Sequence, residues 1–335
     1  MTAQLRAIRV APRRYQRGVN LIEIMVAMVI GLFLILGATT LYVSTKKTAD
    51  VDDSIARLQE TARYALSVIE TDVRMANYWG IKKDGADFEN KDTNLNVPAG
   101  STASARGIGT GNYCGATYAT STEKYVEATN NGYGIPNCTA QYAASDSADT
   151  LTVRRASTSV AAASDTQIQV CSTRQTAEIT KSVSETCPGG ELHNLIADGY
   201  YIDTQSSVGS NVPSLRRKTL QDGPTFADTE IVPGVEDMQI ELGWDNSSID
   251  SAGVVQYYQA GAVPATGRIV SIRVWLLIRA EQPDYTFTDT RTYAYADRTG
   301  TATNTLTDDA AYAPADNYRR LLVSRTFFIR NATGT

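Results

Sequence analysis

One long apolar run dominates the N-terminal part of the chain. Leu21 to Val43 contains a single charged side chain, Glu23, and Ile24 to Leu41 contains none. About 20 consecutive apolar residues are enough for an α-helix to cross a bilayer. The run therefore predicts a membrane-spanning helix over residues 19–43, with an isolated carboxylate near its start.

The helical pattern continues beyond the apolar run. In residues 44–76, small or apolar side chains recur every three to four positions between charged ones: Val51, Ile55, Leu58, Ala62, Ala65, Ile69 and Val73. This spacing puts the whole set on one face of a helix. We expect a single helix from Ile22 to Met75, whose amphipathic part packs its apolar stripe on the chain's own globular domain.

Strand patterns follow further along the chain. Residues 84–148 are rich in Gly, Asn, Thr, Ser and Tyr and predict a loop-rich insertion. Beyond it, strands are expected at 151–154, 199–202, 214–217, 238–242, 269–279 and 321–330. A helix followed by a run of strands predicts an α+β fold, in which the long N-terminal helix packs on a mainly antiparallel β-sheet domain of residues 77–335.

The first 18 residues are basic. They contain Arg6, Arg9, Arg13, Arg14 and Arg17 and no acidic residue. Positively charged flanks stay on the cytoplasmic side of a membrane. We therefore expect a single-pass protein with residues 1–18 in the cytoplasm and the globular domain on the other side of that membrane. The apolar run is too long for an ordinary secretory signal, whose apolar region has about 7–15 residues and is followed by a cleavage site of small residues.

The charge of the chain argues against a nucleic-acid partner. The chain has 31 Lys and Arg against 36 Asp and Glu, a net charge of −5, and loss of the five leader arginines would make it −10. Nucleic-acid-binding domains instead concentrate positive charge. The tight basic cluster Arg216-Arg217-Lys218 is expected to be a solvated strand edge.

Four cysteines lie beyond the apolar run: Cys114, Cys138, Cys171 and Cys187. On the expected topology they face an oxidising compartment, in which disulfides persist. Four cysteines allow three connectivities. Pairing between neighbours, Cys114–Cys138 and Cys171–Cys187, is favoured because each bond would staple a loop-rich region.

The sequence shows no motif for catalysis or cofactor binding. The single histidine, His193, cannot alone build a catalytic or zinc site, and no phosphate-binding loop is present. We expect His193 to be an ordinary surface or packing residue. Residues 84–89 offer oxygen ligands without EF-hand spacing, which favours a solvated acidic loop. The sequence thus predicts no enzyme activity, no cofactor and no metal.

The junction between the basic leader and the apolar run resembles the signal of type IV prepilins. That signal is a basic leader, a Gly, a hydrophobic first mature residue and a Glu at mature position five; here they are Gly18, Val19 and Glu23. The resemblance implies that a prepilin peptidase cuts after Gly18 and methylates the new amine of Val19. It also implies that Glu23 pairs with the amine of a neighbouring subunit, and that the membrane is a bacterial inner membrane with the globular domain in the periplasm. Val19 departs from the usual Phe, and no Pro interrupts the helix.

Four later segments resemble the PilW family of minor pilins: residues 148–155, 232–239, 274–279 and 319–322. The resemblance implies a structural protein whose partners are other minor pilins, the major pilin, a large tip adhesin and an inner-membrane assembly platform. Such a protein would belong to a complex that primes type IV pilus assembly at the tip. It would thereby support adhesion and surface motility.

Two other interpretations stay open on the sequence. A minor pseudopilin of type II secretion would share the signal and the helix. A membrane-anchored periplasmic binding module or enzyme would retain residues 1–18. The 18 tyrosines, many of them in loop-rich regions, are compatible with a binding surface as well as with packing.

Overall fold

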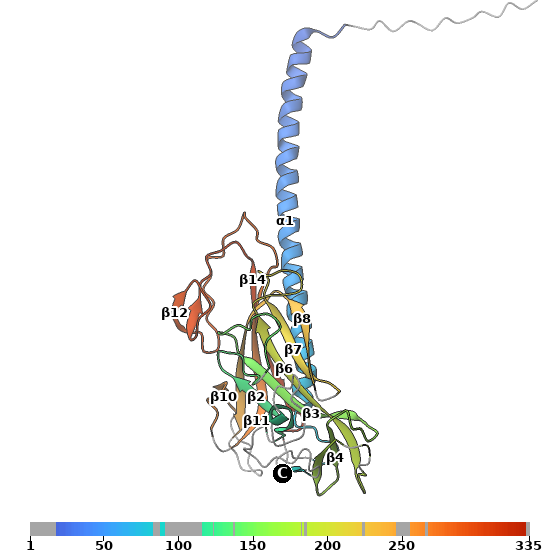
Figure 1. Ribbon diagram of the computed structural model, residues 1–335. Helices are drawn as coiled ribbons and strands as arrows, with labels where there is room; N and C mark the ends of the chain where they lie inside the picture. The colour runs from blue at the N-terminus through green and yellow to red at the C-terminus, as the bar shows by residue number, and fades with distance from the viewer. Residues whose placement is uncertain are drawn as a thin grey trace, which may run out of the picture. The chain divides into compact units, whose positions relative to one another are not determined.

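The chain divides into two compact units after Asp53. The computed structural model describes residues 18–82, 88–90, 116–122, 124–136, 138–181, 183, 186–222, 225–245, 255–264 and 267–332. Helix α1, Leu21–Met75, runs through the end of the first unit into the second, and all the described strands lie in the second (Figure 1). The helix begins one residue before the start that the sequence predicts.

Local backbone chemistry sets both ends of α1. The carbonyl of Asn20 accepts hydrogen bonds from the amides of Glu23 at 3.0 Å and Ile24 at 3.2 Å, so Asn20 occupies the position where the first helical turn is capped. At the other end Asn77 has a φ of +61°. A left-handed residue of this kind ends a helix, and asparagine tolerates the conformation better than most side chains.

The larger sheet has eight strands. Its main path is β1-β5-β4-β6-β3-β2, β7 pairs with β6, and β8 pairs with β7. All pairs except β1–β5 are antiparallel. The bounds are β1 Phe88–Asn90, β2 Val126–Thr129, β3 Thr150–Val160, β4 Gln169–Ser172, β5 Ala177–Thr180, β6 Glu191–Asp203, β7 Ser214–Leu220 and β8 Phe226–Pro233.

The smaller sheet has four antiparallel strands in the order β10-β9-β11-β14. They are β9 Val235–Asp245, β10 Gln256–Gln259, β11 Arg268–Arg279 and β14 Arg320–Phe328. A long connection, residues 280–319, joins β11 to β14 and carries a small parallel pair, β12 Gly300–Thr303 and β13 Ala310–Tyr312. The second unit is therefore an α+β domain with mainly antiparallel sheets, as the sequence predicts.

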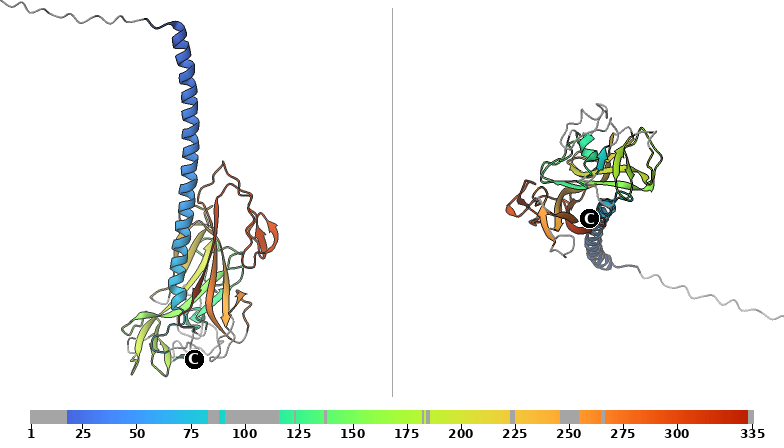
Figure 2. Two further views of the ribbon diagram at one scale, coloured as in Figure 1. Left: turned by 180° about the vertical axis from the view of Figure 1, so that it is seen from behind. Right: turned by 90° about the horizontal axis from the view of Figure 1, so that it is seen from below.

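The core of this unit lies between α1 and the two sheets. Leu58, Ala62, Ala65, Ile69 and Val73 are all at most 5 % exposed, and their cluster includes residues of both sheets. The C-terminal part of α1 accordingly lies against both sheets (Figure 2). Full burial of a large aliphatic side chain stabilises a fold by about 1.5–3 kcal/mol. The predicted stripe is thus confirmed from Leu58 onward, whereas Ile55 remains 41 % exposed.

A tight connection at Gly234 joins the two sheets. Its φ is +84°, its amide donates to the Pro213 carbonyl at 2.7 Å, and its carbonyl accepts from the Arg279 amide at 2.7 Å. A Cβ at this position would lie 2.8 Å from the Arg279 carbonyl oxygen. Glycine satisfies both the conformation and the close approach.

The last described residues fasten the end of α1. The Arg330 amide donates to the Arg74 carbonyl at 3.2 Å, and the Asn77 side chain donates to the Asn331 carbonyl at 2.9 Å. Arg325 on β14 forms an ion pair with Glu70 at 3.1 Å. The final strand and the final turns of the helix are therefore directly joined.

The expected insertion at 84–148 is only partly a loop. Residues 83–87 and 91–115 lie outside the described residues. In the remainder, β2 pairs with β3, and helix α2, Ala116–Thr120, buries Tyr118 to 3 % exposure. Ile135 is 1 % exposed and packs with Tyr118 and Tyr201. Aromatic and aliphatic side chains thus build the described part of this region into the domain.

The prediction of a solvated edge at Arg216-Arg217-Lys218 is wrong. These residues lie in β7, between β6 and β8, and Arg216 and Lys218 are each 5 % exposed. Both donate to Asp228 at 2.7 Å, and Arg216 also pairs with Glu230 at 3.0 Å. The acidic residues of β8 neutralise the cluster because they stand opposite it in the strand register.

Candidate functional site

Gly18 and Val19 lie immediately before the first turn of α1. Both are exposed, and Gly18 has no other group within 4 Å of the place where a Cβ would stand. Val19 is 66 % exposed. The peptide bond between them is therefore accessible to an enzyme from several sides, and the helix that follows holds Glu23 at a fixed spacing from it.

Glu23 is the third residue of α1 and the acidic residue of its first turn. The partly positive end of the helix favours a carboxylate there. Among the described residues, no basic side chain pairs with it.

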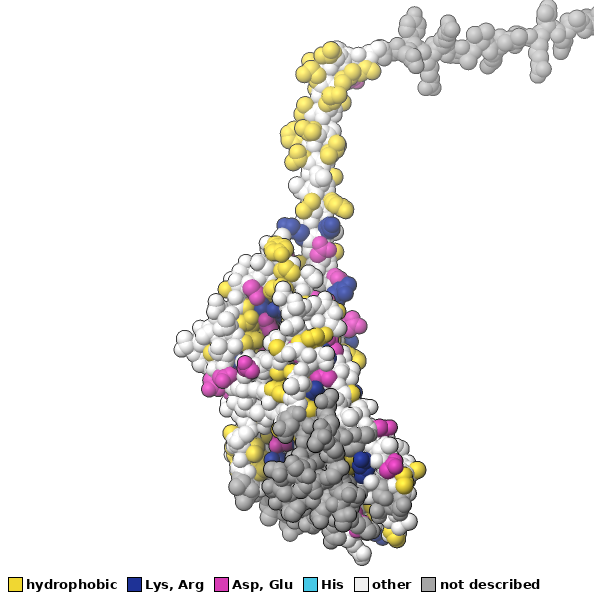
Figure 3. All heavy atoms as spheres, in the orientation of Figure 1, with side chains coloured by type: hydrophobic (Ala, Val, Ile, Leu, Met, Phe, Trp, Pro, Cys, Tyr) yellow, Lys and Arg dark blue, Asp and Glu magenta, His cyan; other side chains and the backbone are white. Residues whose placement is uncertain are grey.

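The first unit exposes apolar side chains on the surface of α1. An 18-residue window of the helix has a mean hydropathy of 2.6, and none of it is buried. Figure 3 shows this band of hydrophobic side chains. In the sequence, the first charged residues after Glu23 are Lys46 and Lys47. The hydroxyl of Thr40 donates to the Gly37 carbonyl at 2.8 Å, which satisfies it without water. By length and composition, this part of α1 can cross a membrane.

Asp72 fastens the opposite end of α1 to the larger sheet. It is 4 % exposed; its Oδ1 accepts from Arg155 Nη2 at 2.8 Å, and its Oδ2 accepts from the Tyr200 hydroxyl. Arg217 lies 3.7 Å from Asp72 and 3.9 Å from Asp198. Burial and the nearby Asp72 raise the pKa of Asp198 to about 6. This buried cluster spans the helix, β3, β6 and β7.

A second buried network holds the β11–β14 connection on the smaller sheet. Arg298 is fully buried; its Nε lies 2.6 Å from Asp237 Oδ2 and its Nη2 lies 2.9 Å from Oδ1. Arg320 pairs with Glu236 and Asp316, each at 2.6 Å. Leu277, on the face of β11 turned toward the connection, packs with tyrosines of that connection. The connection is thereby a fixed part of the domain.

A disulfide joins Cys171 on β4 to Cys187, with a Cα–Cα distance of 5.6 Å. This is one of the two bonds that pairing between neighbours predicts. Cys138 is also disulfide-bonded. Its expected partner, Cys114, lies outside the described residues, so that pairing stays a prediction.

His193 is a packing residue on β6. It is 1 % exposed, meets the edge of the Tyr78 ring at 6.3 Å, and lies so near Gly80 that a Cβ there would be 2.8 Å from its Nε2. Within the described residues, no three His, Cys, Asp or Glu side chains form a metal-binding group. The acidic loop of residues 84–87 lies outside them.

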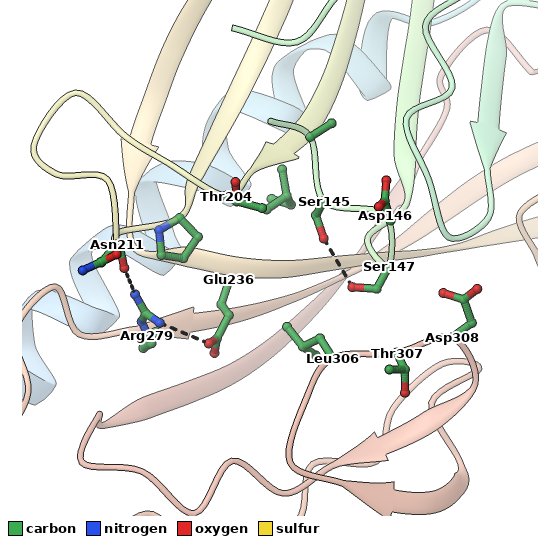
Figure 4. A pocket seen from close by; sticks show the side chains of 13 residues that line it. Ser145, Asp146, Ser147, Thr204, Asn211, Glu236, Arg279, Leu306, Thr307 and Asp308 are labelled. Atoms are coloured by element: carbon green, nitrogen blue, oxygen red, sulfur yellow. Dashed lines mark hydrogen bonds and ion pairs between the residues drawn. The ribbon is translucent and has the colours of Figure 1, made fainter. Parts of the chain in front are cut away.

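A cavity of about 770 Å³ with a mixed polar and apolar lining opens in the second unit. Its lining comes from the loop at 144–147, the segment 202–213, the connection at 306–308 and the ends of β9 and β11 (Figure 4). Arg279 lies 3.5 Å from Glu236 and donates to the Asn211 carbonyl. The lining offers hydroxyls, carboxylates and the Arg279 guanidinium, which can make polar contacts.

Comparison with known proteins gives two family matches. The prokaryotic N-terminal methylation motif matches residues 13–39, and the family described as Type IV Pilus-assembly protein W (PilW) matches residues 199–331. No curated protein matches the chain. Among solved structures, a type IV-like pilin from Thermus thermophilus is similar, with 16 % identity and a TM-score of 0.28 over 55 % of this chain and 78 % of that one.

The first match covers Gly18, Val19 and Glu23 and defines a pilin-type protein that carries an N-terminal methylation signal. The second extends from within β6 to just beyond β14. Together the two matches support a type IV pilus protein of the PilW family. They imply a structural protein that interacts with pilus components and with a prepilin peptidase, and that is anchored in a membrane through its apolar helix.

Proposed function

We propose that this chain is a minor pilin that a prepilin peptidase cleaves after Gly18 and that then joins a complex priming type IV pilus assembly at the tip. The observation that carries the proposal is the exposed Gly18–Val19 bond, which directly precedes an apolar helical surface that is not buried in the chain. Such an apolar surface must be covered by membrane lipid before the subunit enters a pilus, and by the helices of neighbouring subunits afterwards. The match of residues 199–331 to the PilW family supports a type IV pilus rather than a type II secretion system as the assembly that this chain joins.

Glu23 sets the register of the helix in this proposal. Within an apolar bundle an unpaired carboxylate is costly, and an ammonium group beside it offsets that cost. The amine of a neighbouring subunit, freed at Val19, supplies such a group. Because Glu23 is the single charged residue of Leu21–Val43, one alignment of neighbouring helices satisfies it better than the others.

The proposed topology follows from the charges that flank the helix. The arginine-rich residues 1–18 stay in the cytoplasm, residues 19–43 span the inner membrane, and the domain that follows residues 44–76 lies in the periplasm. There it meets other minor pilins, the major pilin and a large tip adhesin. The inner-membrane assembly platform extracts the helix into the fibre.

The N-terminal peptide mass tests the processing step. In cells with prepilin peptidase we expect the chain to begin at a methylated Val19, and in cells without it we expect residues 1–18 to remain attached. An uncleaved N-terminus in both strains would instead support a membrane-anchored binding module.

Replacement of Glu23 tests the assembly step. We expect Glu23→Ala to insert in the membrane and be cleaved normally but to be lost from purified pili, because the carboxylate that pairs with the neighbour is gone. Asp50→Ala, an exposed acid further along the same helix, is the matched control and should assemble. Normal incorporation of Glu23→Ala would refute the register role.

Deletion of the gene for this chain distinguishes a type IV pilus protein from a pseudopilin of type II secretion. Loss of pili with secretion intact supports a minor pilin of the type IV pilus. Loss of exoprotein secretion with pili intact would identify a pseudopilin of type II secretion.

A further inference from the structure

Asp297 is a buried carboxylate with an unused oxygen. It lies in a turn of the β11–β14 connection and is 5 % exposed. Its Oδ2 accepts from Asn131 Nδ2 at 3.2 Å, whereas its Oδ1 is buried without a hydrogen-bond partner. Within the described residues, no Lys or Arg forms an ion pair with it. Buried charges are normally paired or bound to a metal.

Two more unused oxygens belong to the segment that touches Asp297. The Oδ1 atoms of Asn130 and Asn131, just after β2, are also buried without a partner. The backbone fixes their position, since the Asn131 amide donates to Asp149 at 2.9 Å and the Gly132 amide donates to the Ala148 carbonyl at 2.9 Å. Two segments far apart in the sequence therefore meet with oxygens that no protein donor satisfies.

The geometry suits a hard cation. An asparagine amide can turn so that its oxygen and nitrogen exchange places. Such a turn at Asn131 would put two oxygens 3.2 Å apart, the present distance between Asn131 Nδ2 and Asp297 Oδ2. Two oxygens at that separation can both lie about 2.4 Å from one calcium ion.

Two further carboxylates and one guanidinium lie near Asp297. Asp237 is fully buried and neutralised by its ion pair with Arg298, whose guanidinium also lies near Asp297. Asp309 is a second acid close to Asp297. Because Arg298 is bonded to Asp237, the Oδ1 of Asp297 keeps no cationic partner among the described residues.

We propose that Asn130, Asn131 and Asp297 form a calcium site that ties the loop after β2 to the β11–β14 connection. Carbonyls, water or Asp309 complete the coordination. Calcium fits better than magnesium, which demands a strict octahedron and retains water, and better than zinc, which prefers nitrogen and sulfur ligands. Two of the three named side chains are asparagine amides, so the spacing of acidic residues in the sequence does not indicate such a site.

Titration of the full-length protein in detergent tests the proposal. After chelator treatment, we expect calcium chloride to give a binding isotherm with a dissociation constant on the order of 10⁻⁴–10⁻³ M, as in extracellular calcium modules. Calcium should also raise the unfolding temperature, and magnesium chloride at equal ionic strength should do neither. Asp297→Asn should abolish both effects, whereas Asp165→Asn, an exposed acid in a distant loop, should preserve them.

The Asp297→Asn variant has a second signature. Without calcium, the Asp297→Asn variant should be at least as stable to unfolding as the wild type, because the substitution removes an uncompensated buried charge. With calcium, the wild type should be the more stable of the two. If this variant does not fold, Asn130→Ala gives the same test as a several-fold loss of calcium affinity. No calcium response in the wild type, or an unchanged response in Asp297→Asn or Asn130→Ala, would mean that water fills the site and would overturn the proposal.

Discussion

Glu23 and Asp72 stand on the same helix in opposite electrostatic situations. Glu23 has no partner side chain among the described residues, whereas Asp72 is buried and contacts Arg155, Tyr200 and Arg217. In the proposed function Glu23 pairs with a neighbouring subunit, whereas the contacts of Asp72 hold the domain together. Their substitutions should therefore damage different properties, assembly for Glu23 and folding for Asp72.

Asp72→Asn should destabilise the protein. Removal of one partner from a buried ion pair typically costs about 3–5 kcal/mol, because the remaining charge stays buried without compensation. Asp52→Asn, an exposed acid on the same helix, should change stability by less than about 0.5 kcal/mol. Denaturant unfolding of the full-length protein in detergent measures both, and equal midpoints for the two variants would contradict the role of the cluster.

Short-range spacing explains which residues the sequence reveals. Gly18, Val19 and Glu23 lie within six positions and form a recognisable motif. Arg155, which pairs with Asp72, and Arg298, which pairs with Asp237, are 83 and 61 residues away along the chain, so no local sequence pattern predicts these ion pairs. The basic cluster at 216–218 is misread because its acidic partners, 10–14 residues further along, stand opposite it only once β7 and β8 pair.

The expected strand segments fall on β3, β6, β7, β9, β11 and β14, whereas weakly patterned strands such as β8 and β12 were not predicted. β9, β11 and β14 alternate in sequence and bury one side under α1. β8 is half-buried along most of its length and β12 is mostly exposed, so neither shows the period of two on which the prediction depends. The α1 bounds were accessible because apolar periodicity persists over many turns.

The Cys171–Cys187 bond should stabilise its own end of the larger sheet. It closes a loop with a sequence separation of 16 between β4 and the start of β6. Loops of about 15 residues give about 3 kcal/mol in the chain-entropy account. We expect the Cys171→Ala, Cys187→Ala double variant to lose stability of that order in denaturant unfolding. An unchanged midpoint would show that strand pairing alone sets the stability of this region.

The second unit as a whole should lose stability as the pH rises from about 5 to 8.5. Asp149 and Asp198 have pKa values of about 8 and about 6 in the fold, against an ordinary value of 3.8, because burial penalises their charged forms. An acid whose pKa is raised by folding stabilises the fold below its unfolded pKa, and that contribution is lost as pH rises through the folded pKa. Carboxyls with lowered pKa values, such as Asp284 at about 2, are ionised in both states across this window.

Replacement of Asp149 isolates its share of this pH dependence. The Asn131 and Ile240 amides donate to different oxygens of Asp149, so Asp149→Asn keeps an acceptor for one of them and cannot ionise. The variant is therefore judged by the pH dependence of its stability and not by its absolute stability. We expect it to flatten the decline between about pH 6 and 8.5, by a few kcal/mol at most. Thermal unfolding of the full-length protein at a series of pH values shows the change, with Asp165→Asn as the control; a variant that declines like the wild type would count against this assignment.

The joined ends of α1 and β14 have a mechanical consequence. Tension drawn along the helix from its N-terminal side reaches Asp72, Glu70 and Arg74, which are bonded to the larger sheet and to the final strand at nearly the same level of the helix. The load is thus shared between both sheets in parallel, and no single strand can peel away alone. A subunit pulled out of a membrane by its helix would transmit the force to its whole domain at once.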